Sequence, residues 1–189
     1  MDLHRQHKMQ GFTLLELLIV IILVSTLFVF AVDRLLEIRD QAERVSVQTV
    51  VGNLQSALAL DLAEHVVKGR MQQIHLRINS NPMELLADTP INYRGEISHD
   101  ELQKAKSGYW YYNTDKHLLT YLVSNRAGFE SKLSGRARIR LKVVPVYDDL
   151  NKNRVFDHKT DLVKGVILRF QDPFSWKGLE LYVNNNKNE

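Results

Sequence analysis

An apolar segment near the N-terminus, Phe12 to Val32, most constrains what this chain can fold into. Seventeen of its 21 residues are apolar, and Glu16 is its one charged side chain. A helix of this length, rising 1.5 Å per residue, is roughly 30 Å long, which matches the hydrocarbon core of a bilayer. A buried helix of a soluble domain could be equally apolar, but here a basic leader precedes the segment and a charged amphipathic stretch follows it. We therefore expect the segment to span a membrane.

The residues on either side of the span predict its orientation and its fate. Arg5 and Lys8 precede it, and by the positive-inside rule they keep the N-terminus in the cytoplasm. Residues 33–189 then lie outside the cytoplasm. A secretory signal peptide ends at small residues of the A-x-A type, whereas Val32 is followed by Asp-Arg-Leu-Leu-Glu. We expect the span to be retained in the mature protein.

Composition excludes several classes of protein. The chain has 189 residues and no cysteine, so it has no disulfide framework, no thiolate metal site and no cysteine nucleophile. A hydrophobic share of 44% is too high for a disordered chain. The seven histidines are scattered, and no metalloprotease, serine-hydrolase or phosphate-loop motif is present. We do not expect an enzyme.

After the span, apolar residues continue at helical spacing. They form one stripe, which consists of Val47, Val50, Val51, Leu54, Leu58, Leu62 and Val66. We predict a single helix from about Phe12 to Val67, roughly 80 Å long, whose second half packs on a sheet. A coiled coil would need a sustained heptad, which these few turns do not supply.

The remaining residues predict a sheet. Two β-rich runs joined by a polar turn form a hairpin, and a third run alternates apolar and basic residues until Pro145 ends it. The expected strands are 108–112, 118–123, 137–143, 165–170 and 178–183. We expect a short helix over 82–86, irregular structure over 88–96 and a polar tail over 184–189. This pattern predicts an α+β fold.

The sequence Lys-Met-Gln-Gly-Phe-Thr-Leu-Leu-Glu-Leu-Leu-Ile-Val at 8–20 resembles the N-terminal motif of type IV pilins and of the pseudopilins of type II secretion. In that family a prepilin peptidase cleaves after the glycine and methylates the new N-terminal amine. The resemblance therefore implies cleavage between Gly11 and Phe12 and N-methylation of Phe12. It also implies a type IV pilin-like fold, in which a long N-terminal helix packs on a C-terminal antiparallel sheet.

The resemblance implies four parts with different locations. We expect a prepilin leader over 1–11, a transmembrane and filament-core helix over 12–32, an amphipathic continuation over 33–67 and a periplasmic globular domain over 68–189. The protein would be a single-pass protein of the bacterial inner membrane, with its N-terminus in the cytoplasm. After assembly it would lie in an envelope filament.

Glu16 is a carboxylate inside an apolar segment, where an ionisable group is costly and points to a function. The resemblance implies that it pairs with the N-terminal amine of a neighbouring subunit and holds the subunits in register. Alternatively, Glu16 stays protonated or reaches the cytoplasmic surface. The sequence departs from many relatives at Asp33, where they have a proline, so no kink is imposed on the helix there.

The expected function is that of a pseudopilin or minor pilin, a structural subunit of a type II secretion pseudopilus or a type IV pilus-like filament. Its partners would be the prepilin peptidase, other pilins or pseudopilins, and the inner-membrane assembly platform. The lack of a C-terminal cysteine pair favours the secretion pseudopilin over a surface pilin. The alternatives are a membrane-anchored DNA-binding minor pilin of an uptake system and a single-span periplasmic protein that does not polymerise.

The DNA-binding alternative depends on the basic side of the third strand. Four cations project from it about 7 Å apart, a spacing that could follow phosphates; they are Arg136, Arg138, Arg140 and Lys142. A strand face that merely lies in solvent has the same pattern. We expect a strand face that lies in solvent, and we expect no nucleic-acid partner.

A second candidate site is an acidic loop that resembles a calcium-binding loop. Oxygen ligands recur at relative positions 1, 3, 5, 7 and 9, which are Asp149, Asn151, Asn153, the carbonyl of Val155 and Asp157. Arg154 occupies the turn position that usually needs glycine. The twelfth position is Thr160, with Asp161 one residue late. The loop is either a calcium site completed by Asp161 or an acidic turn between two strands.

Overall fold

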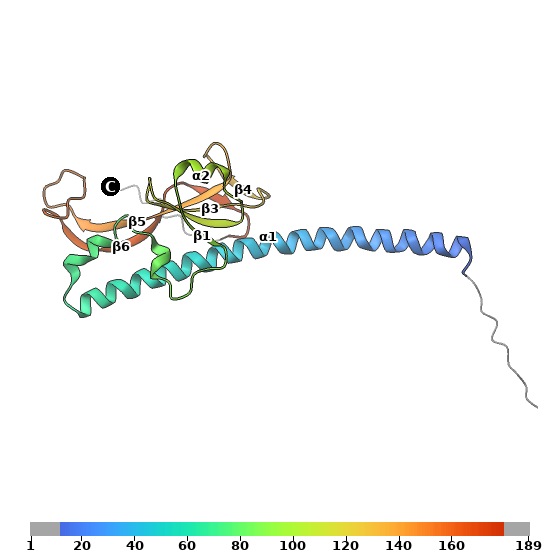
Figure 1. Ribbon diagram of the computed structural model, residues 1–189, viewed down its shortest axis with the longest axis horizontal. Helices are drawn as coiled ribbons and strands as arrows, with labels where there is room; N and C mark the ends of the chain where they lie inside the picture. Colours follow the sequence, from blue (N-terminus) through green and yellow to red (C-terminus); the bar gives the residue numbers. More distant parts are fainter. Residues whose placement is uncertain (1–11, 180–189) are drawn as a thin grey trace, which may run out of the picture. The chain divides into compact units, whose positions relative to one another are not determined.

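The chain forms an α+β fold, seen in a computed structural model that describes residues 12–179 (Figure 1). Its contacts divide it into two units, one ending at Asp40 and the other beginning at Gln41. The helix α1, Leu14–Val67, has 54 residues and contributes to both units. The predicted long helix is confirmed, and it runs through Asp33 and Gly52 without interruption.

Helix α1 begins at a capping residue. The backbone amide of Glu16 donates to Thr13 Oγ1 at 3.2 Å, and the amide of Leu17 donates to the Thr13 carbonyl at 3.1 Å. A threonine before a helix accepts hydrogen bonds that the first turn would otherwise lack. The threonine therefore fixes the start of the helix two residues after Phe12.

The second unit contains a five-stranded sheet in the order β1-β2-β3-β5-β6. Its strands are β1 Tyr93–Ile97, β2 Tyr109–Asn113, β3 Leu118–Leu122, β5 Arg138–Asp148 and β6 Leu162–Phe170. Neighbouring strands are antiparallel except for β1, which pairs with β2 in parallel. Two short strands, β4 Phe129–Ser131 and β7 Phe174–Trp176, form a separate antiparallel pair.

Most of the predicted strands are confirmed, with two corrections. The segment 88–96, expected to be irregular, contains most of β1, and because β1 pairs with β2 in parallel the sheet is mixed rather than wholly antiparallel. Strand β5 does not end at Pro145, which lies opposite Val166. Strand β3 pairs with β5 only as far as Leu141, so the proline lies where β5 has a single partner and its missing N–H costs little.

Three short helices complete the second unit. They are the 3₁₀ helices η1 Met71–Arg77 and η2 Pro82–Leu85 and the α-helix α2 His99–Lys104. The short helix expected over 82–86 is η2, which Asn81 caps by accepting from the Met83 amide at 3.1 Å. Gly178 and Leu179 lie outside any strand, and the rest of the strand expected over 178–183, like the polar tail, lies outside the described residues.

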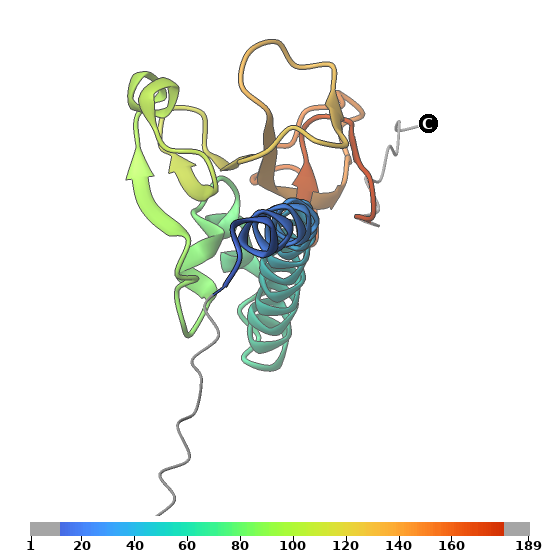
Figure 2. The ribbon, with the colours of Figure 1, turned by 90° about the vertical axis from the view of Figure 1, so that its right-hand side faces the viewer.

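The core of the second unit lies between the second half of α1 and one face of the sheet, and Figure 2 views α1 end-on. The apolar stripe predicted from the sequence packs on the sheet from Val47 to Leu62, whereas its last residue, Val66, is exposed. Val51 and Leu54 are fully buried there with Trp110. Each such side chain contributes roughly 1.5–3 kcal/mol relative to an exposed one. A side chain at Gly165 would begin 3.1 Å from Leu62 Cδ2, so glycine lets β6 approach the helix closely.

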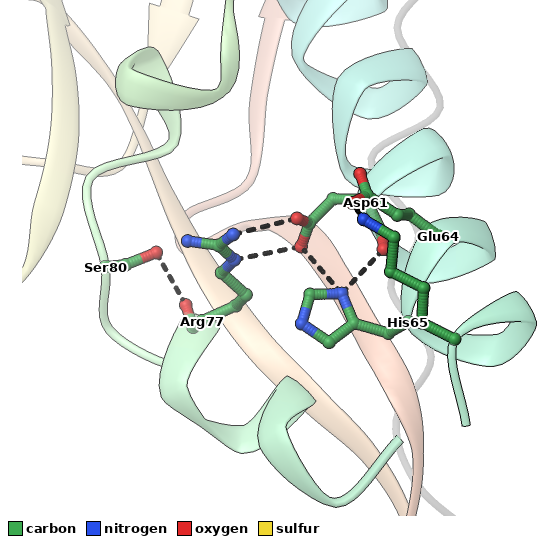
Figure 3. A network of polar contacts seen from close by, with 6 residues as sticks. Asp61, Glu64, His65, Arg77 and Ser80 are labelled. Atoms are coloured by element: carbon green, nitrogen blue, oxygen red, sulfur yellow. Dashed lines mark hydrogen bonds and ion pairs between the residues drawn. The ribbon is translucent and has the colours of Figure 1, made fainter. Parts of the chain in front are cut away.

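Polar contacts attach the end of α1 to η1 (Figure 3). Arg77 donates two hydrogen bonds to the carboxylate of Asp61, from Nε at 2.9 Å and from Nη2 at 2.8 Å. These bonds raise the pKa of Arg77. His65 Nδ1 lies 2.7 Å from the Asp61 carbonyl oxygen, and Glu64 pairs with Lys68 on the outer side of the helix. The Asp61 carboxylate thus holds together two segments 16 residues apart.

Candidate functional site

The predicted processing and assembly residues lie at the start of α1. Gly11 lies outside the described residues, whereas Phe12 precedes the helix with an exposed side chain. Glu16 is the third residue of the helix, and its side chain is exposed. Among residues 12–179, no side chain or amide is hydrogen-bonded or ion-paired to the Glu16 carboxylate. That carboxylate is thus available to a partner from outside the described chain.

The first unit leaves its apolar residues uncovered on every side of the helix. Leu14 is 84% exposed and Phe28 is 68% exposed, and the large side chains between them are exposed as well. A helix that is apolar all round requires an apolar environment. In the described part of the chain, α1 is the one helix long and apolar enough to cross a membrane. The hydroxyl of Thr26 is satisfied inside the helix, since it donates to the Ile22 carbonyl at 2.8 Å.

The candidate calcium loop is organised by its own side chains. The carboxylate of Asp149 accepts a hydrogen bond from the Arg154 amide at 2.6 Å. Arg154 has a φ of 62°, a left-handed conformation that favours glycine, so the chain makes the sharp turn with arginine in its place. Asn151, Asn153 and Asp157 each accept from an amide two residues further on.

Asp161, the candidate final ligand, lies at the centre of this loop. It is buried, and its two carboxylate oxygens accept from the amides of Leu150 at 3.3 Å and Asp157 at 2.8 Å. Asp149 Oδ1 is buried without a hydrogen-bond partner among the described residues. An oxygen in that position is suited to a hard cation such as calcium. However, the region 12–179 holds no group of three or more His, Cys, Asp or Glu side chains arranged to bind a metal.

The basic side of β5 alternates with buried apolar residues as predicted, but its arginines are held by acceptors of the domain itself. Arg140 donates two hydrogen bonds of 2.6 Å to Asp172, which raise the pKa of Arg140. Arg136 donates to two backbone carbonyls at the end of α2 and to Ser107 Oγ. Arg138 donates to the carbonyls of Ser134 and Arg136. The three guanidinium groups therefore do not form a free row of cations.

Two contacts that stabilise the fold were not predicted from the sequence. Thr13 caps α1, and its spacing from Glu16 matches the capping pattern [ST]-x-x-[DE], so a local signal was present. The contact of Asp61 with Arg77 joins two elements through an intervening turn. No local pattern specifies which acidic residue such an arginine meets.

Comparison with protein families identifies one region of the chain. A family model described as the prokaryotic N-terminal methylation motif matches residues 6–32. No curated protein and no solved structure matches the chain. This motif is characteristic of structural rather than enzymatic proteins, and it implies processing by a prepilin peptidase and assembly with other pilins. The chain is thus a protein with the prepilin motif of type IV pilins and pseudopilins.

Proposed function

We propose that the protein is a pseudopilin or minor pilin, a structural subunit of a type II secretion pseudopilus or of a related pilus-like filament. The observation that carries the proposal is the methylation motif at the start of a helix whose first half exposes apolar side chains on every side. Such a surface is stable in a bilayer or among the helices of other subunits. The lack of cysteine favours the secretion pseudopilin over a surface pilin with a C-terminal disulfide.

The proposed pathway begins in the inner membrane. Residues 12–32 span the bilayer with the leader, residues 1–11, in the cytoplasm and residues 68–189 in the periplasm. The prepilin peptidase cleaves between Gly11 and Phe12 and methylates the amine of Phe12. An assembly platform then moves the helix into a filament, which replaces one apolar environment with another. Glu16 meanwhile gains the positive amine of a neighbouring subunit, which offsets the cost of a carboxylate in apolar surroundings.

The role of Glu16 is tested by removing its carboxylate. Glu16→Ala should abolish incorporation of the protein into filaments isolated from cells, while cleavage of the leader continues. The control is Glu37→Ala, which removes an exposed carboxylate of the same helix that pairs with Arg34 at 2.5 Å. Normal incorporation of the Glu16→Ala protein would rule out the register mechanism.

Processing is tested separately at the cleavage site. Gly11→Leu places bulk next to the scissile bond, and the chain should keep its leader and stay in the membrane fraction. If this variant is cleaved and assembled as usual, the proposed site is wrong. If the unaltered protein keeps its leader in cells that contain the peptidase, the chain is instead a single-span protein that does not polymerise.

We also propose that the loop from Asp149 to Asp161 binds calcium. The buried, unpartnered Asp149 Oδ1 and the left-handed Arg154 support this proposal, and the oxygen donors suit calcium. Calcium should raise the unfolding temperature of the full-length protein in detergent, and a chelator should reverse the rise. Asp149→Asn should abolish this response, whereas Asp148→Asn, which removes an ion pair with Lys164, should retain it. An unfolding temperature insensitive to calcium would contradict the proposal.

A further inference from the structure

Two buried polar side chains lie on the face of the sheet that points away from α1. Thr120 of β3 is 0% exposed and Asn113 of β2 is 1% exposed. Thr120 Oγ1 and Asn113 Nδ2 have no hydrogen-bond partner within residues 12–179. The two residues are diagonal neighbours on adjacent strands, since Thr120 lies opposite Tyr111 and Asn113 opposite Leu118. Buried polar atoms are almost always hydrogen-bonded, so two unpartnered atoms on the same face of the sheet require an explanation.

Both residues line the same small pocket, whose other lining residues come from α2, β3 and β5 and from the segments next to them. Its volume is about 80 Å³, which corresponds to two or three water molecules at roughly 30 Å³ each. The pocket therefore has room for one small group rather than for a polymer chain. We call it the cationic pocket because its lining contains His99, Lys116, Arg136, Arg138 and Arg140 but no Asp or Glu.

The cationic pocket has positive charge that its surroundings only partly balance. Arg140, which lies directly opposite Thr120 in the sheet, is paired with Asp172. Among the described residues, the recorded hydrogen bonds of Arg136 and Arg138 are to carbonyl and hydroxyl oxygens rather than to carboxylates. Burial and the neighbouring Arg140 lower the pKa of Arg138. The lining thus has three guanidinium groups, of which Arg140 is paired with Asp172, and the Asp115 carboxylate accepts a hydrogen bond from the backbone amide of His99 at 2.7 Å.

The groups that line the cationic pocket are mostly donors. The amide nitrogen of Asn113 donates only, and the hydroxyl of Thr120 can donate as well. The planar guanidinium groups match a carboxylate with two parallel hydrogen bonds, as Arg140 and Asp172 already do beside the pocket. The arginines are already held in place by their other hydrogen bonds. Binding of a further group therefore costs little conformational entropy of the arginine side chains.

We propose that the cationic pocket binds one carboxylate, supplied by an acidic side chain of a partner protein. The carboxylate accepts hydrogen bonds from Thr120 and Asn113 and is paired with Arg138. The small volume disfavours DNA, which needs a row of accessible cations along its backbone. This binding site lies within the second unit and does not depend on whether the chain polymerises.

The test uses the full-length ¹⁵N-labelled protein in detergent micelles at constant ionic strength. The probes are a short peptide with two adjacent glutamates, the same peptide with glutamines, inorganic phosphate and a DNA oligonucleotide. The glutamate peptide should shift the amide signals of Thr120 and Asn113, and the glutamine peptide should not. Equal responses to the two peptides, or tighter binding of phosphate or DNA than of the glutamate peptide, would overturn the proposal.

Variants of the lining residues give a second readout. Thr120→Val keeps the shape of the side chain and removes the hydroxyl, and we expect about tenfold weaker binding of the glutamate peptide. Arg138→Gln should weaken binding by a similar factor, whereas Thr120→Ser should retain it. Arg169→Gln removes an exposed cation of β6 outside the pocket and serves as the control. Unchanged affinity in both Thr120→Val and Arg138→Gln would contradict the assignment.

Thr120→Val also gives a prediction for the unfolding temperature of the protein without any ligand. Because Thr120→Val removes an unpartnered buried hydroxyl, the unliganded protein should unfold at the same temperature or a higher one. A lower unfolding temperature would mean that the hydroxyl serves the fold and not a ligand. The binding comparison would then be made with Arg138→Gln against Arg169→Gln, and equal affinities of those two would refute the proposal.

Discussion

The two halves of α1 use the same kind of residue in opposite ways. In the first unit the large apolar side chains from Leu14 to Ile38 are exposed. In the second unit an apolar stripe that includes Val47, Val51 and Leu54 is fully buried against the sheet. Both halves are continuous helix. The difference therefore lies in what surrounds the helix and not in its local structure.

This contrast separates residues that stabilise the domain from residues that serve an environment outside the chain. The second half places its polar residues on one side and its apolar residues on the other, as a helix on a domain surface does. The span over 12–32 has no polar side, and Glu16, the one carboxylate of that span, has no partner among the described residues. Mutations in the two halves should therefore affect different measurements.

The largest expected effect on the domain comes from its core. Leu54→Ala removes a fully buried side chain from the stripe and should lower the free energy of unfolding by about 3 kcal/mol, because it leaves a cavity. Denaturant unfolding of the full-length protein in detergent, followed by the fluorescence of the two buried tryptophans, Trp110 and Trp176, measures the change. The matched control is Leu23→Ala in the exposed half, which should leave this unfolding transition where it is. Similar decreases in the free energy of unfolding from both substitutions would contradict the proposed difference between the two halves of α1.

A smaller effect is expected where the end of α1 is attached to η1. Asp61→Asn leaves Arg77 without its partly buried carboxylate partner and should lower the free energy of unfolding by about 2 kcal/mol. The comparison is Glu64→Gln, which breaks an exposed ion pair with Lys68 and should have little measurable effect. If the two variants unfold alike, the Asp61 contact is not a structural attachment.

The domain should also lose stability at high pH because of two tyrosines in its core. Burial raises the pKa of Tyr112 to about 12. The pKa of Tyr121 is raised further, by burial and by Glu43, whose carboxylate accepts a hydrogen bond from the Tyr121 hydroxyl. Unfolded tyrosine titrates near pH 10. The two protonated tyrosines therefore make their full contribution to the free energy of unfolding below about pH 10. That contribution is lost as the pH rises towards their pKa values in the folded protein. Unfolding temperatures measured across this range should fall, and Tyr121→Phe should reduce the fall.

The smallest expected effect compares two helix caps, one in each unit. Ser98 and Glu101 form a capping box at α2, and Ser98→Ala should lower the free energy of unfolding of the domain by about 1 kcal/mol. Thr13→Ala removes the cap of α1 in the exposed half and should leave domain unfolding unchanged. A loss of domain stability from Thr13→Ala would show that the start of α1 contributes to the domain fold.

Sequence patterns predicted the elements whose signal is local. The stripe of α1, the β2–β3 hairpin and the alternation of β5 all follow from periodicity within one segment. Strand β1 alternates between half-buried and exposed residues, but glycine occupies its middle half-buried position, so its apolar signal is weak and it exists through pairing with β2. Similarly, Pro145 remains in a strand because of where β3 ends. Such outcomes depend on neighbours that a local pattern does not specify.

The candidate sites also differ in whether their sequence signal is local. The processing site and Glu16 stand out in the sequence because motif and charge lie within one segment. The cationic pocket gathers residues from α2, β2, β3 and β5. Its arginines were visible as an alternating strand, but the hydroxyl of Thr120 and the amide of Asn113 acquire meaning only through their burial.

The mass of the N-terminal peptide tests the central proposal most directly. The protein is produced in cells that contain a prepilin peptidase, purified from the membrane or filament fraction, and digested for mass spectrometry. We predict a chain that begins at Phe12 and carries one added methyl group on its amine. A chain that retains Met1 to Gly11 in the presence of active peptidase would contradict the account.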